Sequence, residues 1–475
     1  MFNLIRKWRQ PILAVTCGWF VLFTVVGPVR PAAAFSVGEE KEVGEQLLAI
    51  VRKEFKVIDA PDVVQYVNRV GGNILRAAGP QFFNYHFFVI KNKEFNAFAA
   101  PSGMIFIHSG LIKTMATEGE LMSVVAHEVG HAASRHIADR IEKSTKINAG
   151  TAAMALAGIL MGAGPVSEAV VVGSLAAGTT MNLKFSRQDE EEADRLAYKY
   201  MRELDRNPSS MVSMLQKMYR IDRYRQGQVP AYLLTHPQPA LRMGYVQNLL
   251  QMDGTVAYPS EDQFAFRRIK CRILSMSEEP SALLPVYLRE ADDPELDADR
   301  RAMAWYGVSL AQLANADFDG ALSSLAKVIA KYPNQHILQT DLGNIHFEAG
   351  HYEKALEIFQ KTFATAPDCL HTKYYLARSL RKAGRLPEAA RLYDELLVVM
   401  PDNVDLHLQL GRIKAEMGEM ASGYYHLGAY HWYDGNVEMA KRHLRQAVEL
   451  AKKDSEEKRA ADELLATIAR VEKMK

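Results

Sequence analysis

The stretch Leu121-Met-Ser-Val-Val-Ala-His-Glu-Val-Gly-His-Ala-Ala133 decides how this 475-residue chain is read. It contains His127-Glu128-Val129-Gly130-His131, and on a helix the residues at i and i+4 share a face. Two imidazoles at that spacing can bind one metal ion, and the glutamate beside the first can reach a metal-bound water. The surrounding residues are mostly apolar, as in a buried helix. The sequence therefore predicts a helix over residues 117–140 that carries a metal site.

A third metal ligand is expected further along the chain. A catalytic zinc ion takes three protein ligands and keeps one open position. Candidates lie in Ser186-Arg-Gln-Asp-Glu-Glu-Glu-Ala-Asp194, within a helix predicted over residues 186–205, where Glu190 and Asp194 share a face. An acidic run is more often a solvated helix surface, so this segment alone leaves the choice open.

The two motifs together carry a family resemblance. His-Glu-x-x-His followed by Ser-Arg-x-x-Glu-x-x-Ala-Asp resembles the gluzincin peptidases of the CaaX-prenyl-protease and HtpX-like family. The resemblance implies that His127, His131 and Glu190 bind one zinc ion per chain. It makes Asp194 a partner for a ligand histidine. It also makes Glu128 the general base of a zinc metalloendopeptidase.

A predicted hairpin extends the resemblance. Residues 85–90 are rich in aromatic and β-branched side chains and are predicted as a strand. Asn96-Ala-Phe-Ala-Ala-Pro-Ser-Gly-Met-Ile-Phe-Ile107 is predicted as a hairpin with its turn at Pro101-Ser-Gly103. This segment resembles the family's strand before the active helix, which could pair with an extended peptide substrate. The expected substrate contacts are Asn96, Ala97, Phe98 and Ala99.

A second histidine motif adds a further candidate. Thr235-His236-Pro237, followed by Arg242, resembles the family's T-H-P motif. The resemblance places His236 near the metal, where it either stabilises the oxyanion or occupies the open position in a resting form. The alternative is a turn histidine before proline.

Residues 1–34 differ from the rest of the chain. A basic start at residues 6–9 is followed by an apolar run over residues 11–26 and by small residues that end at Ala34. This pattern is typical of a secretory signal peptide cleaved near Ala34, and an uncleaved membrane anchor is the alternative. The formal net charge of the whole chain, +1, gives no indication of nucleic-acid binding.

A second apolar stretch, residues 149–181, is broken at Gly162-Ala-Gly-Pro165, and neither half is long enough to span a bilayer. In the membrane-bound members of the family that it resembles, the corresponding region is transmembrane. Here it is interpreted as a hydrophobic flap beside the cleft, as a peripheral membrane contact, or as a buried core hairpin.

The C-terminal part is periodic. Three sets of residues recur every 34 positions: Pro333, Pro367 and Pro401; Ala321, Ala355 and Ala389; Gly350 and Gly384. A helix–turn–helix unit of this length resembles the tetratricopeptide repeat. The small residues let paired helices approach closely, and the prolines end each second helix. Ala440 follows Ala389 by 51 positions, so half a repeat has been inserted or shared.

These observations predict a mostly α protein with an α+β catalytic domain, a small β-sheet and an α-solenoid tail. Residues 36–80 are predicted to be helical. The expected domains are a signal peptide (1–34), a zinc metallopeptidase domain (35–252), a helical linker (253–299) and repeats with a capping helix (300–475). Cys271 and Cys369 remain after cleavage, and the sequence leaves open whether they form a disulfide.

The combination resembles periplasmic chaperone-proteases of Gram-negative bacteria that act on outer-membrane β-barrel proteins. The resemblance implies unfolded or misassembled exported polypeptides as substrates. It also implies that the repeat tail binds outer-membrane β-barrel assembly components. The alternative from a different class is a repeat-based chaperone or scaffold whose zinc site is nearly silent. The presence of Glu128 in the motif argues against that alternative, because a purely structural zinc site needs no base.

Overall fold

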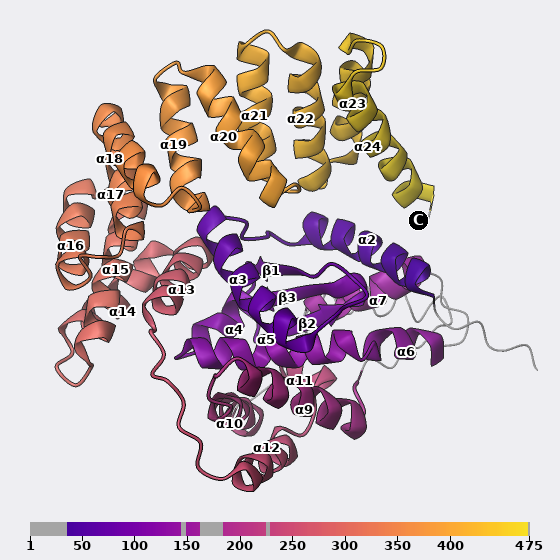
Figure 1. The fold of residues 1–475 in the computed structure, drawn as a ribbon, viewed down its shortest axis with the longest axis vertical. Coiled ribbons are helices and arrows are strands. Elements are labelled where there is room, and N and C mark those ends of the chain that lie inside the picture. The colour runs from indigo at the N-terminus through magenta and orange to yellow at the C-terminus, as the bar shows by residue number, and fades with distance from the viewer. Residues whose placement is uncertain (1–35, 144–148, 162–183, 225–228, 474–475) are drawn as a thin grey trace, which may run out of the picture.

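The computed structural model of the protein describes residues 36–143, 149–161, 184–224 and 229–473. It is mostly helical and contains one small sheet, which confirms the expected fold class. The described part of residues 36–253 forms what we call the sheet unit, and helices α14 to α24 form an arch over it, the helical array (Figure 1). The predicted signal peptide and its cleavage at Ala34 lie outside the described residues.

The helix predicted over residues 36–80 is two helices, α2 (Val37–Glu54) and α3 (Pro61–Ala78). Ser36 begins α2 with a capping box, in which its hydroxyl accepts from the Glu39 N–H and the Glu39 carboxylate accepts from the Ser36 N–H. The chain is extended at Phe55, and Pro61 then begins α3, since its missing N–H costs nothing in a first turn.

The sheet has three strands in the order β1-β3-β2. They are β1 (His86–Ile90), β2 (Ala97–Ala100) and β3 (Met104–His108). β1 runs parallel to the central strand β3, and β2 runs antiparallel to it through a turn at residues 101–103, as the hairpin prediction required. Ser102 takes a left-handed conformation in that turn, with φ of 67°.

The register of β2 decides which of its groups bond to β3. The His108 N–H donates to the Asn96 carbonyl at 3.0 Å, and Phe98 lies opposite Phe106. In an antiparallel pair the bonded residues alternate, so Ala97 and Ala99 direct their backbone N–H and C=O groups to the outer edge of the sheet. The edge of β2 therefore faces the rest of the sheet unit.

Eight further helices complete the described part of the sheet unit (Figure 1). They are α4 (Ser109–Thr114), α5 (Glu118–Ala133), α6 (His136–Lys143), α7 (Ala149–Met161), α9 (Arg187–Glu203), α10 (Ser209–Tyr224), α11 (Ala231–Thr235) and α12 (Pro239–Asp253). The helix predicted over residues 117–140 ends at Ala133, because Arg135 has a φ of 54° that breaks it from α6. Arg135 pairs there with Glu40 of α2.

Helix α7 is the described part of the apolar segment 149–181. It packs against α2, and Ala152, Ala153, Leu156 and Ala157 are buried in one cluster with Val43 and Leu47. The described half of the segment is thus part of a core, and residues 162–183 lie outside the described residues. Among the helices that the structure describes, none is long and apolar enough to cross a membrane.

The remaining helices form the C-terminal part, and from α14 on each packs against the next along the chain. They are α13 (Phe264–Ser277), α14 (Pro280–Asp292), α15 (Ala298–Ala314), α16 (Phe318–Lys331), α17 (Ile337–Glu348), α18 (Tyr352–Thr365), α19 (Leu370–Lys382), α20 (Leu386–Val399), α21 (Val404–Glu416), α22 (Met420–Tyr433), α23 (Val437–Leu450) and α24 (Glu456–Lys473). The periodic alanines Ala321, Ala355 and Ala389 are fully buried between paired helices. Gly350 and Gly384 end first helices in the left-handed region.

The expected linker, residues 253–299, contains helices α13 and α14. Phe266, Ile269 and Ile273 of α13 belong to the core of the sheet unit, whereas Cys271 and Leu274 belong to that of the array. Helix α13 is therefore shared between the two parts. Cys271 and Cys369 are both free.

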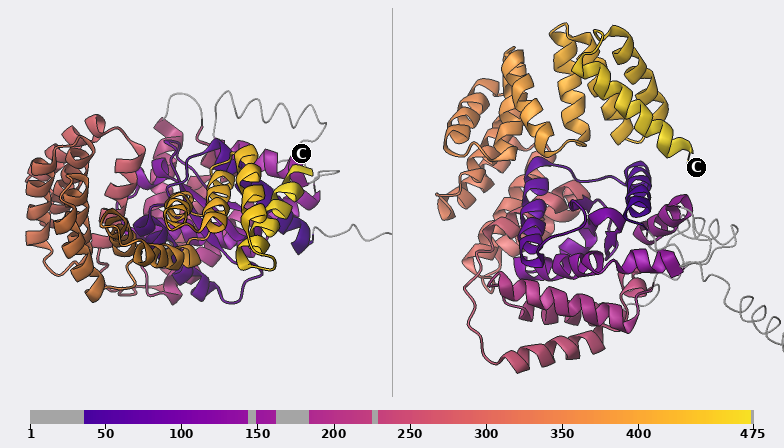
Figure 2. Two further views of the ribbon diagram at one scale, coloured as in Figure 1. Left: turned by 90° about the horizontal axis from the view of Figure 1, so that it is seen from above. Right: turned by 45° about the vertical axis from the view of Figure 1, so that its right-hand side comes forward.

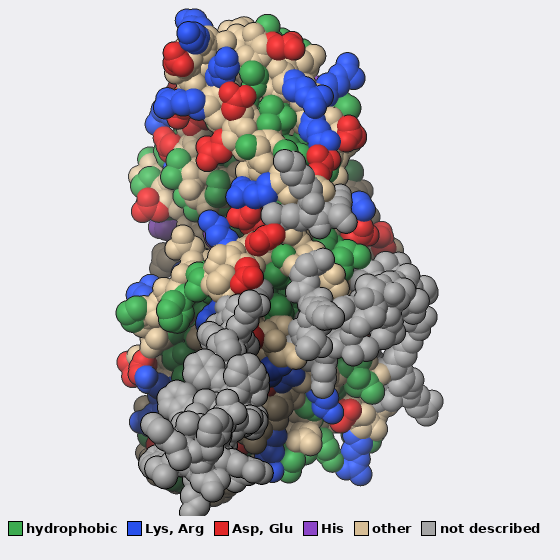
Figure 3. Space-filling model, turned by 90° about the vertical axis from the view of Figure 1, so that its right-hand side faces the viewer, with side chains coloured by type: hydrophobic (Ala, Val, Ile, Leu, Met, Phe, Trp, Pro, Cys, Tyr) green, Lys and Arg blue, Asp and Glu red, His purple; other side chains and the backbone are tan. Residues whose placement is uncertain are grey.

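The array also contacts the sheet unit far from α13. Gln65 of α3 bonds to the backbone of Asp368, and Arg52 of α2 pairs with Asp402. The last helices lie beside α2 in the right-hand view of Figure 2. On the face drawn in Figure 3, acidic and basic side chains are interspersed over the array.

Candidate metal centre

Helices α5 and α9 cross closely, and this contact brings the two sequence motifs together. A β-carbon on Gly130 would lie 3.0 Å from the Ala193 carbonyl oxygen, so glycine permits the close approach. Ser186 caps α9 through a capping box with Asp189, which places Glu190 in the first turn. The inner faces of both helices are buried, and the motif residues point into the space between them.

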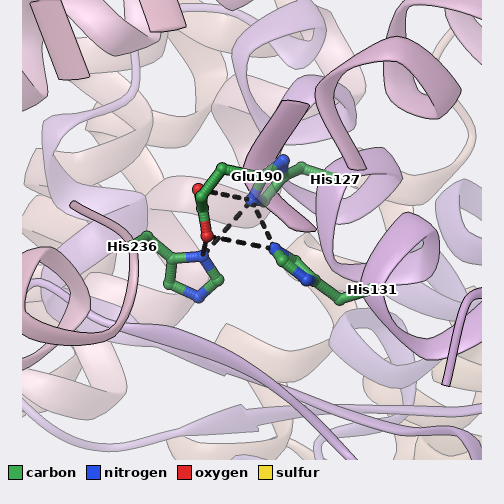
Figure 4. A group of neighbouring side chains, drawn as sticks. All are labelled: His127, His131, Glu190 and His236. Carbon is green, nitrogen blue, oxygen red and sulfur yellow. Dashed lines mark hydrogen bonds and ion pairs between the residues drawn. The ribbon is translucent and has the colours of Figure 1, made fainter. Parts of the chain in front are cut away.

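Four side chains converge in that space: His127 and His131 from α5, Glu190 from α9 and His236 at the end of α11 (Figure 4). One ligand atom from each lies within 4.8 Å of all the others. The two histidine Nε2 atoms are 3.0 Å apart, and His131 Nε2 lies 3.4 Å from Glu190 Oε1. Each side chain is at most 3% exposed, so the cluster is enclosed by protein.

The ligand histidines are oriented by groups behind them. Asp194 Oδ1 lies 2.9 Å from His127 Nδ1, which leaves Nε2 turned toward the cluster. His131 Nδ1 lies 2.8 Å from Nδ1 of His136, the first residue of α6. Asp194 is fixed in turn, because Arg242 donates to both of its oxygens at 2.8 and 2.9 Å. The sequence-predicted partner Asp194 thus lies against a candidate ligand.

The electrostatics of the cluster suit a cation. Burial lowers the pKa of His131 well below its ordinary value, so this imidazole is neutral and can donate a lone pair. Burial alone would raise the pKa of Glu190. The charges of Arg242 and His236 outweigh it and hold the pKa of Glu190 well below the usual range. Glu190 is therefore an anion inside the protein, and a bound cation would compensate it.

Glu128 lies beside the cluster and is held by two donors. The Ala99 N–H, on the outer edge of β2, donates to Glu128 Oε2 at 2.9 Å. The Tyr232 hydroxyl donates to Glu128 Oε1 at 3.1 Å. The carboxylate thus stands between the edge strand and the ligand atoms. Glu128 is not one of the four side chains whose ligand atoms converge.

His236 takes part in the cluster through Nδ1. This atom lies 2.9 Å from Glu190 Oε1 and 3.3 Å from His127 Nε2. The ring stacks on Tyr232, with centroids 4.3 Å apart, and Nε2 lies 3.8 Å from Glu128 Oε1. The imidazole is therefore placed where it can reach the metal position, the base, or both.

The residues present fit a zinc ion. Three imidazoles and one carboxylate form a nitrogen-rich donor set of the kind that zinc binds in catalytic sites. Within the described residues, Glu190 Oε2 forms an ion pair with Arg242 Nη1 at 2.8 Å, and Glu190 Oε1 faces the histidines. The carboxylate can therefore offer Oε1 to a metal ion while Arg242 holds its other oxygen.

The expected substrate strand is buried alongside the site. Asn96, Ala97, Phe98 and Ala99 are each at most 2% exposed. Ala99 contacts Glu128 directly, whereas Phe98 points its side chain into the core beside α2. The outer edge of β2 is therefore correctly oriented for pairing with a peptide, but it is covered in this conformation.

Two side chains of the site were missed from the sequence. Tyr232 stands four residues before His236, a helical spacing that could have placed both on one face. His136 follows His131 by five residues across the break at Arg135, so no regular helical spacing indicates their contact. Arg242 was noted only as part of a motif, without a partner.

Comparison with known proteins gives the family. The chain belongs to peptidase family M48, whose model matches residues 61–250, and this confirms the resemblance. Metalloprotease LoiP of Escherichia coli is 30% identical over 187 residues, which are 39% of this chain and 69% of that protein. The metal of this family is zinc, which agrees with the donor set. Tetratricopeptide-repeat models match residues 306–368, 340–403, 374–421 and 421–454.

Two longer relatives match more of the chain. The beta-barrel assembly-enhancing protease of Escherichia coli is 31% identical over 304 residues, which are 63% of this chain and 61% of that protein. The protein of that name from Yersinia pestis is 28% identical over 304 residues, 63% of this chain and 62% of its own. The match thus spans less than two thirds of the length of these relatives.

Proposed function

We propose that the chain is a zinc-dependent endopeptidase. The observation that carries this proposal is the arrangement of Glu128 between the edge of β2 and the cluster of His127, His131 and Glu190. A structural metal site needs no such carboxylate. Family membership supports the same reaction class.

Each residue has a definite task in this reaction. His127, His131 and Glu190 would hold a zinc ion, which when bound would supply Lewis-acid polarisation of the carbonyl and acidification of a water. Glu128 accepts the proton of the attacking water and later delivers it to the leaving amine. Its two hydrogen bonds, from Ala99 and Tyr232, keep the carboxylate aimed at the metal position.

The edge of β2 is the proposed peptide-binding strand. Main-chain pairing to Ala97 and to the carbonyl of Ala99, whose N–H already donates to Glu128, would hold an extended polypeptide independently of its side chains. That indifference suits substrates that are recognised as unfolded rather than by sequence. Asn96 and Phe98 face β3 and shape the strand instead of bonding to the peptide.

We propose further that His236 occupies the fourth metal position at rest. Its Nδ1 lies within hydrogen-bond range of a ligand oxygen, and the whole cluster is closed from solvent. Cleavage then requires α11 to move. The oxyanion role is the competing assignment, because Nε2 has no hydrogen-bond partner within the described residues.

We infer the cellular setting from the leader and the relatives. The pattern of residues 1–34 predicts export, and two relatives are named for assisting β-barrel assembly. Stalled or misfolded exported proteins in the periplasm are therefore the proposed substrates. The helical array is the proposed binding surface for outer-membrane β-barrel assembly components and for chaperone activity. The described half of segment 149–181 favours the core interpretation over a membrane contact.

The competing function is a repeat-based scaffold with a nearly silent zinc site. The closed cluster with His236 in it is the observation that favours this reading. Metal analysis combined with digestion of an unfolded reporter protein separates the two. An endopeptidase cleaves the reporter, and the Glu128→Gln variant does not. A scaffold binds the reporter equally in both forms and leaves it intact.

A further inference from the structure

An open surface pocket lies next to the candidate active site. It has a volume of about 510 Å³ and lies between the loop before β2, helix α4 and the end of helix α10. Three of its lining residues are cationic: Lys93, Lys113 and Arg220. Phe95, Ile221 and Tyr224 supply apolar surface beside them. We refer to these six residues as the cationic pocket.

The charge of the cationic pocket is compensated in part. None of its lining residues is acidic. Lys113 is engaged, since its Nζ lies 3.0 Å from Glu278 Oε1. Lys93 and Arg220 are exposed and form no ion pair with any carboxylate of the described chain. Two cations are thus available to a ligand, and apolar surface between them can cover the stem of an acidic side chain.

One aromatic pair connects the cationic pocket to the base. Phe95 packs edge-on against Tyr232, with ring centroids 6.0 Å apart. Tyr232 in turn bonds to Glu128. Phe95 is 4% exposed. One side of its ring lines the cationic pocket, and the other side packs in the core of the sheet unit. The pocket is therefore separated from the candidate active site by two rings.

The edge strand leads into the same pocket. Phe95 directly precedes Asn96, and it stands four positions before Ala99, whose N–H contacts Glu128. A peptide paired with β2 advances one residue for each residue of the strand. The peptide residue that reaches the cationic pocket is therefore about four residues from the scissile bond.

We propose that the cationic pocket binds a carboxylate of the substrate polypeptide, about four residues to one side of the scissile bond. The carboxylate belongs either to an acidic side chain or to the C-terminus of the chain. This inference rests on the proposed endopeptidase function, because it takes the peptide to lie along β2. It adds a sequence preference to a site whose main-chain pairing has none.

The binding experiment uses the full-length, zinc-loaded protein in a Glu128→Gln background. The probes are fluorescent peptides that share one neutral sequence and are amidated at the C-terminus. Each peptide carries a single Glu at a different position, and its partner peptide carries Gln at that position. A further probe keeps the neutral sequence and carries a free C-terminal carboxylate. Fluorescence anisotropy measures the ratio of affinities within each pair.

We expect the peptide with Glu about four residues to one side of its central bond to bind about fivefold more tightly than its Gln partner, as two exposed ion pairs would produce. Combined replacement of Lys93→Gln and Arg220→Gln should return that ratio to one. Lys91→Gln, which removes a cation from the same loop outside the pocket, should leave it unchanged. If only the probe with the free C-terminal carboxylate binds more tightly, the pocket binds the C-terminus of the substrate polypeptide.

Three results would overturn the proposal. One is equal affinity for Glu and Gln peptides at every position. Another is a preference that survives the double replacement, and the last is an equal preference on both sides of the centre. Cleavage of the neutral peptide by the wild-type protein is measured separately. If no peptide is cleaved, the endopeptidase proposal fails, whereas the affinity ratios still decide the pocket.

Discussion

The backbone of Ala99 donates to Glu128 Oε2 at 2.9 Å, so the edge strand and the candidate base are joined by one hydrogen bond. The same strand edge is proposed to pair with substrate. A peptide that pairs there is therefore placed beside the carboxylate by the element that also orients it. Glutamate at this position is fixed from two sides, by Ala99 and by Tyr232.

Replacement of Glu128 by Gln should separate metal binding from catalysis. The amide has nearly the shape of the carboxylate but cannot accept a proton, so zinc content and fold should persist while cleavage falls by at least about 100-fold. Metal analysis and digestion of an unfolded reporter measure both. Glu191→Gln, an exposed carboxylate next to Glu190, is the matched control. Normal turnover by the Glu128→Gln protein would exclude Glu128 as the base.

The ligand assignment predicts a graded loss of zinc. His131→Ala removes one of three proposed ligands and should lose most of the metal. His136→Ala removes only the group that orients His131 and should weaken zinc affinity by roughly 10- to 100-fold. Competition with a zinc-binding dye measures both constants, with exposed His86→Ala as control. Unchanged zinc content in the His131→Ala protein is incompatible with the assignment.

His236→Ala distinguishes the two roles of that residue. If His236 occupies the fourth metal position at rest, its removal should raise basal proteolysis while zinc stays bound. If it stabilises the oxyanion, turnover should fall by about 100-fold. The measurement is turnover of an unfolded reporter, normalised to zinc content. A large decrease would contradict the resting-state assignment, and no change would leave His236 as a turn residue.

The contact between α13 and the array predicts a pH-dependent stability. Arg268 donates to both oxygens of Asp341 at 2.7 and 2.9 Å, and the pair is buried. Burial raises the pKa of Asp341, but Arg268 outweighs it and the net pKa is lowered. The carboxylate therefore stabilises the fold above the unfolded-state pKa of about 3.9, and this contribution is lost as pH falls through the lower folded-state value.

Asp341→Asn should accordingly cost about 3–5 kcal/mol of unfolding free energy at pH 7, because it leaves the buried Arg268 undercompensated. The difference in unfolding free energy between the variant and the wild type should become smaller as the pH is lowered from about 5 to about 3, because this range includes the unfolded-state pKa of about 3.9. Denaturant unfolding across this range measures it. Asp299→Asn, an exposed carboxylate of α15, should change little. A cost independent of pH would contradict the electrostatic explanation.

The sequence predicted the parts of this protein that depend on local periodicity. The spacing of His127 and His131 placed both on one helix face, and the recurrence of Ala321, Ala355 and Ala389 located paired helices. It did not predict the break of the first helix near Phe55, which follows from pairing of Val57 with Ile90 far along the chain. Contacts of this kind are set by tertiary packing, which a local pattern does not contain.

The irregular end of the repeats has a similar explanation. Gly423 stands 34 positions after Ala389, so it occupies the position at which the other repeats carry alanine. It packs against Gly411. Helix α22 is therefore the second helix of one pair, and it also packs against α23 as the first helix of the next. The shared half-repeat inferred from Ala440 is this helix. In the candidate site, likewise, His136 and Tyr232 acquire their roles only where separate helices meet.

The pairing of Arg52 with Asp402 joins positions 350 residues apart. Helical pairs fold rapidly through contacts near in sequence. The contact on α2 needs a segment that is synthesised 350 residues later, so it cannot form until most of the chain is present. We therefore expect this long-range contact to form late in assembly, after the local helix pairs.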